Sequence, residues 1–97
     1  MSEVLDAAAV RDGLAGLPEW SGDAAAITRT VELPSFLEAI SAVDRVAVVA
    51  EELGHHPDID IRYRTLTFRC STHSAGGVTP RDLLLARRID EILREPV

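Results

Sequence analysis

The chain has 97 residues, of which 46% are hydrophobic and 27% charged, and its formal net charge is −6. This length and composition predict one globular domain, residues 1–97, and exclude the disordered class of protein. The acidic balance argues against nucleic-acid binding, because phosphate contacts need clustered basic residues and here the arginines are scattered and lysine is absent.

The single cysteine, Cys70, excludes an intramolecular disulfide. It alternates with Leu66 and Phe68, which predicts a core position.

The N-terminus lacks the basic region and apolar core of a signal peptide. No apolar run approaches the ~20 residues that a membrane span needs. We therefore expect a cytoplasmic protein with no membrane partner.

The first third of the chain predicts a short helix and two strands. Residues 5–17 have helical spacing and end near Gly16, with Pro18 just beyond. Residues 20–33 are typical of two strands joined by a turn at residues 21–23. Arg29 falls on the apolar side of the second strand. Either its head group reaches water, or it anchors a carboxylate or a neighbouring subunit.

A long amphipathic helix is predicted from Pro34, in the first turn, to a left-handed stop at Gly54. Pro57 confirms that the helix does not continue. Apolar residues recur at steps of four and three. This predicted stripe consists of Phe36, Ile40, Val43, Ala47 and Ala50, widened by Val46, Val48 and Val49.

The last part of the chain predicts a hairpin, a loop and a helix. Residues 58–71 alternate apolar and polar side chains in two runs, with a turn near Tyr63. After the loop at residues 73–78, Thr79, Pro80 and Asp82 form a strong helix start. The whole order, helix–strand–strand–helix–strand–strand–helix, predicts an α+β fold: a four-stranded antiparallel sheet with helices packed on one face.

All three histidines fall between residues 51 and 82, beside two predicted helix ends. His55 and His56 follow the long helix, and His73 precedes the last one. Imidazole has an unperturbed pKa of ~6.5 and can give or take a proton near neutrality, which suits general acid–base catalysis. Glu51, four residues before His55, could accept a hydrogen bond and set the tautomer of that ring.

Each of these residues also has a purely structural interpretation. These are a helix-dipole cap for His55, a turn residue for His56, a surface residue for His73, a capping-box acid for Asp82 and a solvated acidic pair with Glu52 for Glu51. A zinc site is a further alternative, although adjacent histidines seldom face one ion and no His-x₃-His or Cys-x₂-Cys spacing occurs.

The motif in this region resembles that of the pterin-4a-carbinolamine dehydratases. The family pattern is an acidic residue, three others and His-His-Pro, followed at set distances by an aromatic, a His or Trp, and an Asp. The matching residues are Glu51, His55, His56, Pro57, Tyr63, His73 and Asp82. Flanking similarities extend the resemblance over essentially the whole chain.

The resemblance implies removal of water from 4a-hydroxytetrahydrobiopterin to give quinonoid dihydropterin, in recycling for an aromatic amino acid hydroxylase. It implies no metal or organic cofactor and a homo-oligomer, a dimer or tetramer formed through sheet edges and helices. His55, His56 and His73 would be catalytic, with His55 and His73 in acid–base roles and His56 also binding the pterin. The substrate-binding set would be Glu51, Asp58 and Asp82.

One departure from the family concerns Ile59, where many members have an aromatic residue that could serve as a platform for the flat pterin. The alternative function is a non-catalytic dimerisation or assembly factor of the same fold. Histidines occluded from any open pocket would favour that alternative.

Overall fold

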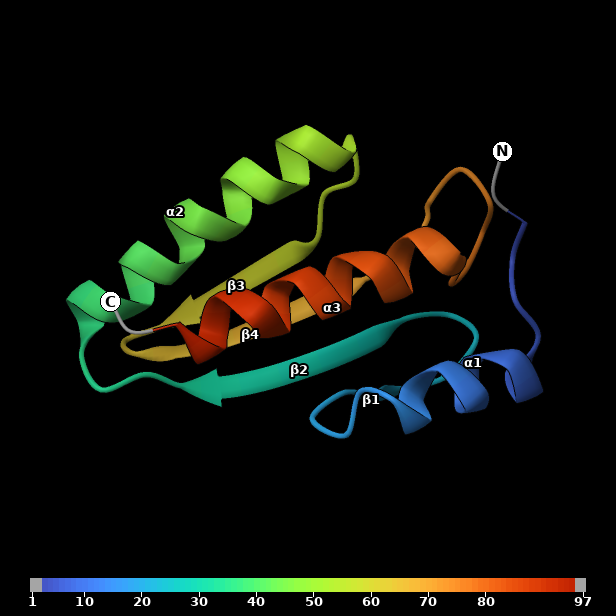
Figure 1. Cartoon of the computed structure of the whole chain (residues 1–97), viewed down its shortest axis with the longest axis horizontal. Coiled ribbons are helices and arrows are strands. Elements are labelled where there is room, and N and C mark those ends of the chain that lie inside the picture. The colour runs from blue at the N-terminus through green and yellow to red at the C-terminus, as the bar shows by residue number, and fades with distance from the viewer. Residues whose placement is uncertain (1–2, 96–97) are drawn as a thin grey trace.

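A computed structural model describes residues 3–95, which form three helices and one four-stranded sheet (Figure 1). The predicted α+β order is confirmed, and the predicted domain of residues 1–97 extends two residues beyond this range at each end. The elements are α1 Ala7–Ala15, β1 Ser21–Gly22, β2 Ile27–Glu32, α2 Phe36–Leu53, β3 Asp58–Arg62, β4 Thr65–Cys70 and α3 Pro80–Arg94.

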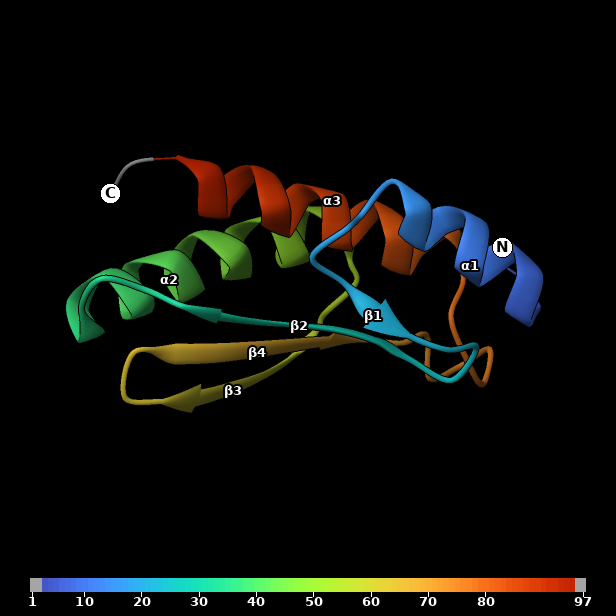
Figure 2. The same ribbon diagram turned by 90° about the horizontal axis from the view of Figure 1, so that it is seen from below.

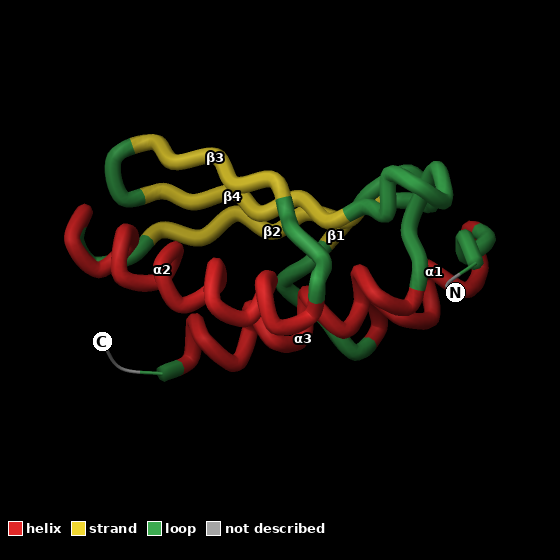
Figure 3. Tube along the Cα trace, turned by 90° about the horizontal axis from the view of Figure 1, so that it is seen from above, coloured by secondary structure: helices red, strands yellow, loops and turns green. Residues whose placement is uncertain are grey.

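The sheet is antiparallel throughout, with the strand order β1-β2-β4-β3. Figures 2 and 3 show the helices stacked on one face of it. Ile27, Leu66 and Phe68 point into the layer between sheet and helices and are fully buried. Cys70, which pairs with Ile27, continues this buried row, as its alternation predicted. None of the helices in residues 3–95 is long and apolar enough to cross a membrane.

The buried face of α2 matches the predicted stripe only in part: Val46, Val49 and Ala50 are buried as predicted, but other members of the stripe are not. Its buried residues are Ala39, Ala42, Val46, Val49 and Ala50. Phe36 is 50% exposed, Val48 is 61% exposed, and Ala47 is exposed as well. Apolar residues occur on almost every side of this helix, so spacing alone could not select the buried face. Small alanines at the contact allow the helix backbone to lie close to its neighbours.

The start of α2 also differs from the prediction. Pro34 precedes the helix instead of opening it, and Ser35 is the N-cap: its Oγ accepts from the Glu38 N–H at 3.1 Å. The predicted end is confirmed, because Gly54 adopts φ 61°, ψ 32°. The His55 N–H then donates to the Ala50 carbonyl at 3.0 Å, which closes the left-handed cap.

Replacing Gly54 by alanine should lower the free energy of unfolding by about 1–2 kcal/mol, the usual cost of a left-handed conformation for a residue with a Cβ. Within residues 3–95, no atom beyond the two neighbouring residues lies within 4 Å of the added methyl group, so a steric clash adds nothing. Urea denaturation would measure the change. Gly16→Ala is the matched control, since Gly16 ends α1 at φ −89°. Equal stability of the two variants would contradict this account.

The predicted turn at residues 21–23 is wrong, because Ser21–Gly22 is itself strand β1. The turn follows it, and Asp23 organises it: Oδ1 accepts from the N–H groups of Ala25 and Ala26 at 2.8 and 3.4 Å. An Asp side chain that bonds the backbone two residues on is a common way to reverse the chain.

Arg29 anchors a carboxylate within its own chain. Its Nη1 donates to Asp90 Oδ1 at 2.7 Å, and its side chain is only 15% exposed. The expectation of a head group in water is therefore wrong, and the carboxylate interpretation is confirmed. Trp20 Nε1 donates to the same oxygen at 2.7 Å. Asp90 thus ties α3 to β2 and to the segment before β1.

Candidate active site

The three histidines line one pocket of about 260 Å³. It lies where the end of α2, the loop after β4 and the first turn of α3 meet. The lining consists of Gly54, His55, His56, Ser71, Thr72, His73, Ser74 and Arg81. The structure therefore brings together residues that are up to 27 positions apart in the chain.

His55 is the buried histidine of this pocket, with 8% of its surface exposed. Its Nε2 lies 2.6 Å from Oδ1 of Asp82, which is fully buried. The left-handed conformation of Gly54 turns the chain so that the His55 ring points towards α3. The pair therefore depends on the stop of one helix and the start of another.

Asp82 combines two roles that the sequence left as alternatives. Its Oδ2 accepts from the Thr79 N–H at 2.9 Å, which completes the predicted capping box of α3. Its Oδ1 remains available for His55. A buried carboxylate at a helix N-terminus is favoured by the helix dipole and by the free backbone N–H groups.

The His55–Asp82 contact determines which ring nitrogen can do chemistry. An ionised carboxylate only accepts hydrogen bonds, so Nε2 of His55 must carry the proton it shares with Asp82. Nδ1 has no hydrogen-bond partner within residues 3–95. It is therefore the nitrogen available to a molecule in the pocket, as an acceptor in the neutral ring or a donor in the charged one.

Glu51 pairs with His56 and not with His55, contrary to the prediction. Spacing of four residues suits a continuous helix, but the helix ends at Leu53 and the following residues leave its axis. Both partners are largely exposed. His56 thus lies on the open side of the pocket, where a hydrogen bond to Glu51 orients its ring.

The other predicted site residues are placed differently. His73 is exposed in the loop after β4 and lines the pocket. Asp58 is exposed at the start of β3, 3.7 Å from Arg69 and outside the pocket lining, so its role in binding stays a prediction. Ile59 is partly buried against the core and is likewise absent from the lining. Within residues 3–95, no cluster of His, Cys, Asp or Glu has an arrangement suited to a metal ion.

Four lining residues were not among the predicted site residues: Ser71, Thr72, Ser74 and Arg81. Thr72 is 4% exposed and continues the buried alternation of Phe68 and Cys70, a signal that could have identified it. Arg81 follows the helix cap, and its Nη2 donates to the Gly54 carbonyl at 2.8 Å, a contact that no local pattern indicates. Arg81 thereby joins the start of α3 to the end of α2.

Cys70 lies near the site but is not part of its chemistry. Burial, together with the negative charges of Asp82 and Asp58, raises the pKa of the Cys70 thiol far above its ordinary value. The thiol therefore stays protonated at neutral pH and does not act as a nucleophile.

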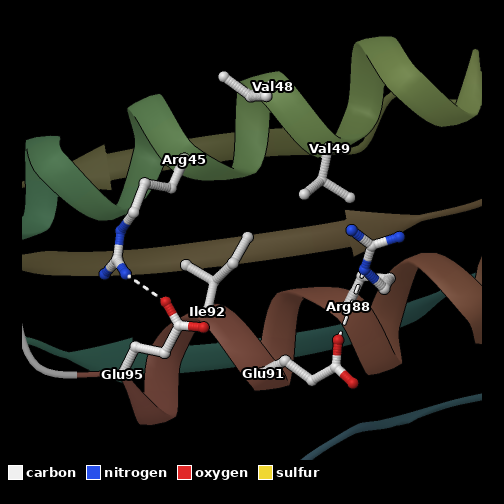
Figure 4. Close-up of a pocket in the computed structure, with 7 residues that line it drawn as sticks. All are labelled: Arg45, Val48, Val49, Arg88, Glu91, Ile92 and Glu95. Atoms are coloured by element: carbon white, nitrogen blue, oxygen red, sulfur yellow. Dashed lines mark hydrogen bonds and ion pairs between the residues drawn. The ribbon is translucent and has the colours of Figure 1, made fainter.

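A second cavity, of about 290 Å³, lies between α2 and α3 (Figure 4). It is lined by Arg45, Val48, Val49, Arg88, Glu91, Ile92 and Glu95. Its charged groups pair with one another: Arg45 with Glu95 at 3.1 Å and Arg88 with Glu91 at 3.4 Å. Its centre is apolar. The groups suited to proton transfer therefore gather at the histidines and not here.

Comparison with known families gives a match over residues 3–92 to the model described as pterin 4 alpha carbinolamine dehydratase. A Nocardia farcinica protein provisionally named a pterin-4-alpha-carbinolamine dehydratase is 55% identical, over 96% of this chain and 98% of its own length. A Roseiflexus castenholzii protein of the same provisional name is 47% identical, over 96% of this chain and all of its own.

Two solved structures share the fold. A transcriptional coactivator/pterin dehydratase from Brucella melitensis has a TM-score of 0.87 and 31% identity, over 91% of this chain and 96% of its own. A pterin dehydratase-like RuBisCO assembly factor of the alpha-carboxysome has a TM-score of 0.64 and 18% identity, over 79% of this chain and 89% of its own. At that identity the second likeness concerns the fold alone.

Proposed function

The chain belongs to the pterin-4a-carbinolamine dehydratase family, and on that premise we propose that it removes water from a 4a-hydroxytetrahydropterin to give a quinonoid dihydropterin. One observation carries the proposal: three imidazoles line a single pocket, and one of them is held by a buried carboxylate. In this reading the substrate arises from a tetrahydropterin-dependent aromatic amino acid hydroxylase.

The proposed reaction needs one proton donor and one proton acceptor. The C4a–O bond breaks with its electron pair on the departing hydroxyl, which takes up a proton and leaves as water. A ring N–H gives up a proton, and its electrons form the new C=N bond. The net proton change is zero. One imidazolium and one imidazole therefore suffice, and exchange with solvent restores them.

His55 and His73 are the groups we assign to these two transfers. His55 presents Nδ1 from a fixed position, since Asp82 holds Nε2 at 2.6 Å. His73 is exposed and can exchange protons with water directly. His56, oriented by Glu51 at the pocket opening, is assigned to substrate binding. Burial alone does not separate these roles, because His73 and His56 are both exposed; the pairing with Glu51 distinguishes His56.

Stopped-flow ultraviolet spectroscopy of a synthetic 4a-hydroxytetrahydropterin tests this function. We expect the protein to accelerate dehydration well beyond an equal concentration of free imidazole, which controls for unpositioned acid–base catalysis. Decay at the rate seen with free imidazole would contradict the proposal.

The second candidate is a non-catalytic dimerisation or assembly factor. Exposed apolar side chains on α2 favour it: Leu37 is 78% exposed, and Val48 borders the cavity between α2 and α3. The open pocket supports the dehydratase instead, because an assembly role does not require accessible histidines. Under this alternative the stopped-flow experiment would give only the uncatalysed rate.

We also propose a homo-oligomer, a dimer or a tetramer. Strand β3 is at the edge of the sheet and pairs on one side with β4, so its other side can accept a strand. The exposed Leu37 and Val48 offer a second apolar contact on α2. Light scattering in solution would give the number of copies.

A further inference from the structure

Behind His55, a chain of hydrogen bonds runs from the backbone of α3 to Asp82. Thr72 Oγ1 lies 2.7 Å from Asp82 Oδ2 and 2.8 Å from Thr79 Oγ1. Thr79 Oγ1 in turn accepts from the Arg81 N–H at 3.2 Å. Thr72, Thr79 and Asp82 are all buried, with 4% exposure or less, so water does not compete for these bonds.

The number of available protons determines which group is the donor and which the acceptor in each of these hydrogen bonds. Each threonine hydroxyl has one proton to donate, and an ionised carboxylate donates none. The bond between Thr72 and Asp82 therefore uses the Thr72 proton. Thr79 must donate in the contact between the two hydroxyls, since Thr72 has no second proton. Every bond thus points towards Asp82.

The direction of these hydrogen bonds also determines which nitrogen of the His55 ring carries the proton. Two donors, the Thr72 hydroxyl and the Thr79 N–H, occupy Oδ2 of Asp82. Oδ1 is left for His55, whose Nε2 must then be the protonated nitrogen. The opposite tautomer, with the proton on Nδ1, would require Asp82 to carry the proton between them. Two donors on Oδ2 favour the ionised carboxylate and so disfavour that arrangement.

We propose that Thr72 is a positioning residue: its hydroxyl, acting through Asp82, fixes the tautomer of His55 so that Nδ1 is the nitrogen that meets the substrate. The effect on turnover rests on the proposed dehydratase function. The effect on the tautomer does not, because it follows from the buried hydrogen bonds alone.

The tautomer can be measured in the wild-type protein by ¹⁵N NMR of the histidine rings at a pH where His55 is neutral. Substitution of each histidine by glutamine assigns the three rings. We expect Nε2 of His55 to be protonated and Nδ1 to show the shift of a bare ring nitrogen. A neutral His55 with its proton mainly on Nδ1 would overturn the proposal without any Thr72 variant.

Thr72→Val removes the hydroxyl and keeps the shape. It should raise the share of the Nδ1–H tautomer and lower kcat about 10- to 100-fold, the change expected from losing a hydrogen bond to a charged group, with KM little altered. Thr72→Ser keeps the hydroxyl and should restore the tautomer and most of kcat. The matched control is Thr67→Val, on the preceding strand β4, which loses an exposed contact to Thr30 (Oγ1···Oγ1 3.0 Å) and should change neither quantity.

An unchanged tautomer and an unchanged kcat in Thr72→Val would contradict the positioning role. Equal losses of kcat in Thr72→Val and Thr72→Ser, with an unchanged tautomer, would contradict it as well. If Thr72→Val fails to fold, Thr72→Ala, which also lacks the hydroxyl, is measured in its place, and the same two readouts decide the question. If the wild-type protein shows no dehydratase activity, the proposed function fails by itself, and the NMR measurement still tests the role of Thr72.

Discussion

Replacing His55 by alanine should lower the turnover number for a 4a-hydroxytetrahydropterin by about 10²–10⁴-fold, the usual contribution of a positioned general acid or base. The ring is 8% exposed and held by a fully buried carboxylate. A water molecule in the vacated space would lack both the proton affinity of imidazole and its fixed orientation. Stopped-flow kinetics at saturating substrate would measure the loss.

Alanine variants of the other two histidines test the different roles proposed for them. His73→Ala should cause a loss in the same range, since the proposed reaction needs both a donor and an acceptor. His56→Ala should mainly raise KM, because its ring pairs with Glu51 at the open side of the pocket. Circular dichroism would check that each variant is folded. Turnover at the wild-type rate in both His55→Ala and His73→Ala would remove these residues from acid–base roles.

The parts of the fold that were predictable have strong local signals. Gly54 followed by Pro57 marks the end of α2, and Thr79-Pro80 with Asp82 marks the start of α3. These signals are backbone requirements of two or three residues and do not depend on the rest of the fold. The proximity of the histidines followed from them, because two helix ends and a hairpin frame the same corner of the domain.

Partners across the site were harder to predict, because tertiary geometry selects them. Glu51 has suitable spacing for His55, yet the left-handed turn at Gly54 directs His55 to Asp82 and leaves His56 to Glu51. The hairpin turn is a similar case: Tyr63 adopts φ 54° without being glycine or asparagine. Bonds between Arg64 and Leu33, at 2.9 and 3.0 Å, hold that turn from a distant part of the chain.

Asp90→Ala should lower the free energy of unfolding by about 3–5 kcal/mol, the usual cost of removing one partner from a buried ion pair. Asp90 Oδ1 accepts from both Arg29 Nη1 and Trp20 Nε1 at 2.7 Å. Arg29 Nε is also buried and has no hydrogen-bond partner in residues 3–95. The variant would leave a mostly buried guanidinium and an indole N–H without their acceptor. Urea denaturation followed by tryptophan fluorescence would report the change at Trp20 directly.

The matched control is Glu95→Ala, which removes the acid of another Arg–carboxylate pair at the end of α3. Arg45 and Glu95 are 3.1 Å apart, but the Glu95 side chain is 64% exposed, so this pair should contribute only ~0–1 kcal/mol. Because α3 also carries Asp82, the same helix that Asp90 ties to the sheet presents the carboxylate that holds His55. Asp90→Ala should therefore retain turnover at temperatures where it stays folded and lose it in step with unfolding. Equal stability losses in the two variants would mean that burial does not determine the strength of these ion pairs.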